Sequence, residues 1–305
     1  MLANVLIWLA LIVIAGLFVW LARRALRLRN LAARWALVVL ATLPALLFAL
    51  VAGLIGYGYA KLYVPRSAPA LALDSAATPE RIARGAHLAR TTCVACHASG
   101  GQLPLSGGID LSADSPLPIG TLVPPNLTPG GPLKDWSDIE IAQAIRNGIH
   151  KNGRTLLMPT DVLRNLSDDD VAALVTFLRS QPPVQNDTPP LNPSPVLALV
   201  FGAGLTELGT PPVTGPVVAP PKEPTAAYGA YVLSYQDCQT CHGADLKGLG
   251  PVPGIAGRSP SYTVRQLFDT QRGTRKGVWA DLMKPVVANL TNQDMLAIAA
   301  YTASR

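Results

Sequence analysis

The chain has 305 residues, of which 49% are apolar and only 14% are charged. This charged fraction is too low for the surface of an ordinary soluble protein and directs attention to charge-free runs. The net charge of +6 does not indicate a nucleic-acid-binding protein, because the part before Ser67 holds seven of the 25 basic residues and no acidic residue.

Two charge-free runs, residues 2–22 and 35–60, each exceed the roughly 20 residues that cross a bilayer as a helix. Between them lie five arginines and no acid, namely Arg23, Arg24, Arg27, Arg29 and Arg34. Short Arg-rich loops stay in the cytoplasm. The sequence therefore predicts a hairpin over residues 1–66 in a bacterial inner membrane, with its N-terminus and all that follows in the periplasm. A cleaved signal peptide over residues 1–22 is disfavoured, because no positive charge precedes the apolar run.

All four cysteines fall in two copies of one pattern, Cys93-Val-Ala-Cys96-His97 and Cys238-Gln-Thr-Cys241-His242. This CxxCH pattern is typical of haem c attachment. Its two thiols bond to the haem vinyl groups, and the adjacent histidine supplies one axial nitrogen to the iron. We therefore predict two covalently bound haem c groups, with His97 and His242 as ligands of the iron.

Three other interpretations compete with haem attachment. Two disulfides would suit an extracytoplasmic compartment but would leave the adjacent histidines unexplained. A thioredoxin-like site requires a βαβ context, whereas short amphipathic helices flank both motifs. A zinc site made from both motifs would have to join segments some 145 residues apart.

Methionines are the predicted sixth ligands. Met158 follows His97 by 61 residues and Met283 follows His242 by 41, each with a proline shortly after it, which favours an extended loop. Thioether ligation fills the iron and suits electron transfer. His87 and His150 are the rival sixth ligands.

The chain after residue 66 shows short capped helices and no strand alternation, so the predicted fold class is all-α. Residues with side-chain oxygens open the predicted helices, namely Thr78, Ser137, Ser167 and Thr291. One of these helices stops at Gly148, and further helices are predicted over residues 226–235 and 264–271. The order helix, motif, helix, methionine, helix occurs twice, which indicates duplication.

The predicted domains are a haem domain over residues 67–185 and a second over residues 225–305. Each is small for an independent core, so the haem is expected to supply much of it. The linker between them, residues 186–224, holds ten of the 28 prolines and is expected to be an extended spacer. Its apolar middle, residues 196–205, is either a short helix packed on a haem domain or a contact with a partner or the bilayer.

A family resemblance rests on residues 85–90, 125–129, 136–138, 145–148 and 166–178 of the first domain. They are similar to the cytochrome c subunits of membrane-bound alcohol and sugar-acid dehydrogenases. In the second domain, residues 238–243, 254–257, 272–273 and 289–301 resemble class I dihaem cytochromes of the c4 kind. The resemblance implies two class I cytochrome c domains.

Site residues follow from the same resemblance. It places Met158 and Met283 at the methionine ligand positions. It also implies that backbone carbonyls near Pro104 and Pro251 orient the two proximal histidines. The chain departs from the dehydrogenase subunits, which carry three haem motifs and a C-terminal membrane contact. Two membrane helices before two haem domains also resemble the dihaem subunit of C-family proton-pumping oxidases.

The predicted function is periplasmic transfer of single electrons by a membrane-anchored dihaem cytochrome c, as part of or donor to a respiratory or dehydrogenase complex. Expected partners are a membrane-bound redox complex (a dehydrogenase, quinol oxidoreductase or terminal oxidase) and membrane lipid, with no nucleic acid. Residues 74–185 carry a net charge of −2 and residues 222–305 one of +3, so the second domain is expected to dock an acidic partner or the first domain. The alternatives are a dihaem peroxidase, which needs one exchangeable iron position, and a purely structural anchor.

Overall fold

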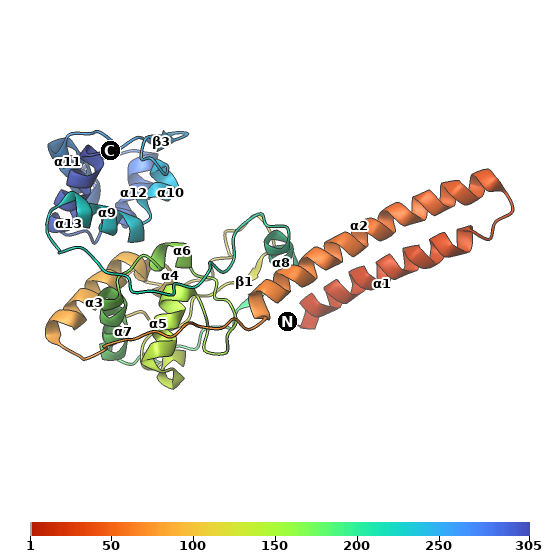
Figure 1. Cartoon of the computed structure of the whole chain (residues 1–305), viewed down its shortest axis with the longest axis horizontal. Helices are drawn as coiled ribbons and strands as arrows, with labels where there is room; N and C mark the ends of the chain where they lie inside the picture. The colour runs from red at the N-terminus through yellow and green to blue at the C-terminus, as the bar shows by residue number, and fades with distance from the viewer. Residues whose placement is uncertain (1) are drawn as a thin grey trace.

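The computed structural model describes residues 2–305, and helices dominate it. Within these residues the strands form two short antiparallel pairs, β1 (Gly120–Thr121) with β2 (Asn192–Pro193) and β3 (Gly248–Leu249) with β4 (Val252–Pro253). Figure 1 shows three parts: a long hairpin, a first unit from α3 to α7 beside it, and a second unit from α9 to α13. The predicted all-α class is confirmed.

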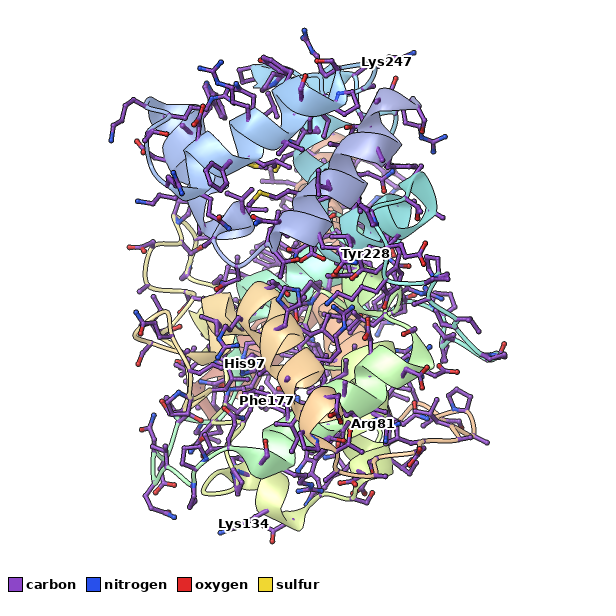
Figure 2. The ribbon with its side chains drawn as sticks, turned by 90° about the vertical axis from the view of Figure 1, so that its left-hand side faces the viewer. Arg81, His97, Lys134, Phe177, Tyr228 and Lys247 are labelled. Carbon is purple, nitrogen blue, oxygen red and sulfur yellow. The ribbon has the colours of Figure 1, made fainter. Side chains whose placement is uncertain are left out.

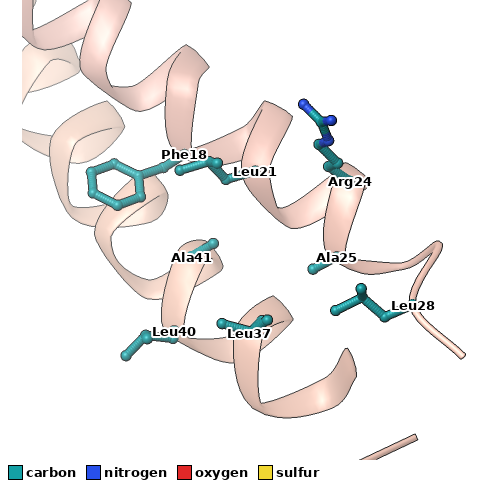
Figure 3. A pocket seen from close by; sticks show the side chains of 8 residues that line it. All are labelled: Phe18, Leu21, Arg24, Ala25, Leu28, Leu37, Leu40 and Ala41. Atoms are coloured by element: carbon teal, nitrogen blue, oxygen red, sulfur yellow. The ribbon is translucent and has the colours of Figure 1, made fainter. Parts of the chain in front are cut away.

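The hairpin consists of α1 (Leu2–Ala25) and α2 (Leu31–Tyr63), which lie antiparallel. The indole of Trp8 donates a hydrogen bond to the carbonyl of Ala52 at 2.8 Å and ties the two helices together. Both are long and apolar enough to cross a membrane. Near the arginine-rich turn they line an open, mostly apolar hollow of about 320 Å³ (Figure 3).

Helix α2 is longer than a membrane crossing requires. At 1.5 Å per residue its 33 residues extend about 50 Å, against about 30 Å of hydrocarbon. A membrane crossing would therefore use only part of α2, and the last turns of the helix lie beside the first unit (Figure 1). There Leu62 is only 1% exposed, because other segments of the chain cover it.

The first unit contains α3 (Pro79–Thr92), α4 (Val94–His97), the 3₁₀ helix η1 (Pro132–Asp135), α5 (Asp138–Asn147), α6 (Thr160–Leu163) and α7 (Asp168–Ser180). The predicted caps are present: Thr78, Ser137 and Ser167 accept hydrogen bonds from backbone amides at the helix starts. Gly148 ends α5 in the left-handed conformation, as predicted.

The second unit repeats this arrangement with α9 (Ala226–Tyr235), α10 (Cys238–His242), α11 (Pro260–Gln271), α12 (Val278–Val287) and α13 (Asn292–Ala303). Its first and last helices cross closely at Gly229, where a Cβ atom would meet the carbonyl oxygen of Ala297 at 1.9 Å. The first unit has the same crossing of α3 and α7 at Gly85, where a Cβ would meet the oxygen of Ala173 at 2.0 Å. The shared crossing supports the predicted duplication.

The proline-rich segment is not extended throughout. Its middle forms α8 (Pro195–Gly202), which lies against the end of α2 (Figure 1). The two helices approach at glycines: a Cβ on Gly58 would meet the carbonyl oxygen of Ala198 at 1.8 Å, and one on Gly202 that of Leu54 at 1.9 Å. The expected short helix is present, but its main neighbour is α2 rather than a haem unit. The predicted domain boundaries stay predictions.

Candidate haem sites

In the first motif, the cysteines and histidine lie at the junction of α3 and α4. Cys93 ends α3, and His97 closes α4 with only 7% of its surface exposed. The Nδ1 atom of His97 lies 2.9 Å from the carbonyl oxygen of Pro125. A carbonyl accepts only, so Nδ1 carries the proton and Nε2 keeps its lone pair free for a metal. Burial also lowers the pKa of His97, although the same hydrogen bond opposes this shift.

In the second motif, α10 (Cys238–His242) carries both thiols and the histidine. Asp237 precedes it in the left-handed conformation, with φ of 55°. His242 is 7% exposed, and its Nδ1 lies 2.7 Å from the carbonyl oxygen of Pro253. Both motifs therefore present a buried imidazole with one nitrogen held by a proline carbonyl, which is the state a metal-binding histidine requires.

The prolines that hold the histidines are not the predicted ones. The carbonyl of Pro104 accepts from the backbone amide of Ser106, and Pro125 takes the place beside His97. Pro125 is positioned by the next residue, Asn126, which is fully buried and donates to the carbonyl of Val184 at 2.8 Å. These contacts lie far apart in sequence, which is why motif spacing did not reveal them.

In the second unit the acceptor lies near the predicted Pro251 but is Pro253, two residues further on. Pro251 lies in the turn between β3 and β4, which pair Gly248 with Pro253. The β4 strand brings the carbonyl of Pro253 over His242. The pairing of β3 with β4 fixes the position of Pro253, whereas Pro251 lies in the turn outside the paired residues.

The competing interpretations of the cysteines find no support. Within residues 2–305 no disulfide joins any of the four cysteines. Burial raises the pKa of Cys93 to about 11 and that of Cys238 to about 12, whereas redox-active thiols have lowered values. No group of three or more His, Cys, Asp and Glu side chains with metal-binding geometry occurs within residues 2–305, so a zinc site spanning both motifs is absent from them.

The two candidate methionines lie in different local structures. Met158 lies in the predicted loop, just before α6, is half-buried, and packs against the main core. Met283 packs against the same core, but it lies inside α12, so the predicted loop is wrong there. Pro285 itself lies inside this helix, so it does not end the helix before Met283. Of the other methionines, Met295 is 1% exposed in α13, and Met1 lies outside the described residues.

The rival histidines have other contacts. The Nε2 of His87 lies 3.3 Å from the Oδ2 of Asp294 in the second unit. His150 rests edge-on against Trp136, and its Nδ1 accepts from the backbone amide of Asn152 at 3.2 Å. Burial lowers the pKa of His150, together with the nearby charge of Arg154. Each rival thus has a structural role that does not involve a metal.

A buried polar network joins the two units, and sequence reasoning missed it. Arg84 of α3 and Asp170 of α7 form a two-pronged ion pair at 2.7 and 2.6 Å. Tyr231 of α9 donates to the same carboxylate at 2.6 Å and accepts from the backbone amide of Ser167 at 2.9 Å. Figure 2 shows neighbouring Tyr228 at the junction of the units. The signal in the sequence was three tyrosines, at 228, 231 and 235, on one helical face.

The residues present fit two haem c groups. Each motif supplies paired thiols, a buried imidazole with a free Nε2, and a half-buried methionine in the same core. When bound, haem iron with a histidine and a methionine ligand supplies a reversible one-electron couple at raised potential. The interface between the units is buried and hydrogen-bonded, so the two sites are held in a fixed relation.

Comparison with known families matches both units. Residues 80–178 match the model for subunit III of cbb3-type cytochrome c oxidase, and residues 226–305 match the cytochrome c model. Cytochrome c-554(548) of Halomonas halodenitrificans is 39% identical over 69 residues, which are 22% of this chain and 83% of that protein.

Larger relatives match as well. The gluconate 2-dehydrogenase cytochrome c subunit of Pantoea cypripedii is 33% identical over 182 residues, 55% of this chain and 39% of that subunit. Cytochrome c4 of Azotobacter vinelandii is 28% identical over 172 residues, 55% of this chain and 69% of that protein. The chain spans only 22% of another relative, a nicotinate dehydrogenase subunit of Pseudomonas putida.

The two predicted resemblances, to dehydrogenase cytochrome subunits and to c4-like cytochromes, are confirmed, and these relatives give no support to a peroxidase. Matches to electron-transfer families in both units assign the chain to electron transfer. The chain belongs to the cytochrome c family, and its two CxxCH motifs bind two haem c groups covalently.

Proposed function

We propose that this chain is a membrane-anchored dihaem cytochrome c that passes single electrons on the periplasmic side of a bacterial inner membrane. It acts as a subunit of, or donor to, a respiratory or dehydrogenase complex and has no catalytic site of its own. One observation carries the proposal: two units with equivalent buried CxxCH histidines are hydrogen-bonded to each other, and the first of them is hydrogen-bonded to an apolar helical hairpin.

The proposed axial pairs are His97 with Met158 and His242 with Met283. Pro125 and Pro253 hold the two imidazoles in the tautomer that leaves Nε2 free. Cys93, Cys96, Cys238 and Cys241 form the thioether bonds. The proposed haem domains are residues 67–185 and 225–305, flanking the 186–224 segment.

The orientation rests on charge. Five arginines lie at the closed end of the hairpin, and Figure 1 shows the haem units at its opposite end. With the arginines held in the cytoplasm, both units lie in the periplasm. Anchoring also raises the effective concentration of the haems near membrane partners, so weak docking suffices.

The partner is proposed to be a membrane-bound redox complex, a dehydrogenase, quinol oxidoreductase or terminal oxidase. Relatives named as cytochrome subunits of dehydrogenases support this class. The second unit, with its charge of +3, is proposed to dock an acidic surface. Electrostatic docking makes the electron-transfer rate fall as ionic strength rises.

Gentle detergent extraction followed by affinity purification of the tagged full-length chain tests the proposal. We expect a redox complex to copurify and its substrate to reduce both haems. The electron-transfer role would be contradicted if no copurified component reduced the haems. The orientation would be contradicted if, in intact spheroplasts, protease cleaved the arginine loop but not the haem units.

A further inference from the structure

The segment that carries Met158 is attached directly to the end of the membrane helix. Thr155 is 2% exposed and makes two hydrogen bonds to the last turn of α2. Its backbone amide donates to the carbonyl of Leu62 at 3.0 Å, and its hydroxyl donates to the carbonyl of Lys61 at 2.9 Å. Carbonyls in the last turn of a helix have no partner within the helix, so Thr155 caps α2 from a distant part of the chain.

A third backbone bond reinforces this junction. The amide of Arg66, just after α2, donates to the carbonyl of Gly153 at 2.8 Å. Gly153 has φ of 87°, and a Cβ there would come within 2.8 Å of Pro65. The chain leaving α2 therefore lies in close backbone contact with the loop that leads to Met158.

Side-chain packing continues the attachment up to the methionine itself. Leu157 packs into a small cluster formed by Leu62 of α2 with Leu197 and Phe201 of α8. The next residue, Met158, packs instead against the main core of the haem units. The dipeptide thus joins two hydrophobic clusters, with one side chain in the anchor and the other in the haem site.

Helix α8 strengthens the anchor side of this junction. The ammonium group of Lys61 donates to the carbonyl of Phe201 at 3.0 Å. Asn4 at the start of α1 donates to the carbonyl of Pro193 at 3.0 Å, as does the hydroxyl of Tyr59 at 3.2 Å. Both membrane helices and α8 therefore form one framework beneath the Met158 loop.

The second unit offers a matched contrast. Met283 is also preceded by a leucine, but Leu282 is 61% exposed. Within residues 2–305, α12 makes no hydrogen bond to α1, α2 or α8; its C-terminal end is held by Gln271 of α11, which donates to the carbonyl of Val287 at 2.8 Å. Among residues 2–305, a direct attachment of the methionine segment to α2 and α8 is therefore seen only in the first unit.

We propose that the last turn of α2, with α8, is a positioning element for Met158, acting through Thr155 and Leu157, so that the state of the membrane anchor sets the ligation and potential of the first haem only. The proposal rests on the proposed role of Met158 as a ligand. Thr155 and Leu157 touch neither haem nor iron in this role; they hold the loop that presents the thioether. Loss of a methionine ligand lowers the potential of a haem.

The test uses the full-length holoprotein in lipid nanodiscs. Two readouts are followed: the weak far-red ferric absorption band that marks a sulfur ligand, and the midpoint potential of each haem. Met158→Ala and Met283→Ala are measured first, to establish which half of the band belongs to each haem. Leu157→Ala is then compared with its counterpart Leu282→Ala, and Thr155→Val removes one anchoring bond while keeping shape.

We expect Leu157→Ala to lose up to half of the band, the half assigned to Met158, and to lower the potential of the first haem alone. Thr155→Val should cause a smaller loss of the same half, Leu157→Met should restore it, and Leu282→Ala should change little. If Leu157→Ala yields too little holoprotein, Phe201→Ala, which loosens the same cluster from α8, is measured in its place.

An unchanged band and unchanged potentials in Leu157→Ala or Phe201→Ala, or equal changes at both haems, would overturn the positioning role. If Met158→Ala itself leaves the band intact, Met158 is not a ligand, and the proposed axial pair fails together with this inference. The two failures are therefore distinguishable.

Discussion

The two haem units share their central architecture and differ in what surrounds it. Each has a glycine-mediated crossing of its first and last helices and a buried histidine held by a proline carbonyl. The first unit also carries the junction with α2 and α8, whereas the second contacts the anchor through its neighbour. The shared helix crossing and the held histidine are what haem binding requires. The junction with α2 and α8 reflects the position of the first unit next to the hairpin in the chain. Four sets of substitutions exploit this comparison.

The largest effect is expected from removing one haem at a time. Cys93→Ser with Cys96→Ser, or Cys238→Ser with Cys241→Ser, should each halve the haem content. The haem is expected to supply much of each small core, so the affected unit should unfold. We expect the second unit to become fully protease-sensitive, because fewer outside contacts hold it. Haem content and limited proteolysis measure this. Equal resistance of the two haem-free units to protease would contradict the expected difference between them.

The interface between the units should be the next most sensitive. Arg84→Met leaves the carboxylate of Asp170 buried without its ion-pair partner. Breaking a buried pair in this way costs about 3–5 kcal/mol. The variant should unfold in denaturant at lower concentration and show slower electron exchange between the haems. The exposed pair of Arg265 with Asp269 is the control, since Arg265→Met should change stability by less than about 1 kcal/mol.

The two glycine crossings provide an internal comparison. Gly85→Ala would place its Cβ atom 2.0 Å from a backbone oxygen of the neighbouring helix, and Gly229→Ala would place its Cβ atom 1.9 Å from one. Overpacking of this kind costs about 1–3 kcal/mol or more. Each substitution should destabilise its own unit, as followed by separate haem absorbance changes during unfolding. Gly100→Ala, with no atom within 4 Å of the new Cβ, should have little effect.

The smallest effect concerns acid stability. Burial opposes ionisation of Asp294, but the contact with His87 and hydrogen bonds from Thr291 hold its pKa well below the ordinary value. Its stabilising contribution is therefore present above a pH of about 4, the pKa of an unfolded aspartate, and is lost as pH falls towards the lower folded value. The stability difference between wild type and Asp294→Asn should shrink between about pH 5 and pH 3. A constant difference would exclude the predicted linkage.

Local signals in the sequence predicted much of this structure. Caps such as Thr78 and Ser137 act within three residues, and CxxCH is a pentapeptide, so neighbours alone determine both. The supports of the site were not predictable in the same way. Pro125 reaches His97 across 28 residues, and Thr155 reaches Lys61 across 94. Such contacts depend on how distant segments pack, which periodicity does not encode.

The mass of the intact mature chain tests the account most directly. Purified protein, denatured and extracted with acidic organic solvent to remove any haem that is not covalently bound, should retain the mass of two haem groups. Conversion of Cys238 and Cys241 to serine should reduce this to one. An unmodified polypeptide mass after extraction would contradict the covalent attachment on which the electron-transfer role depends.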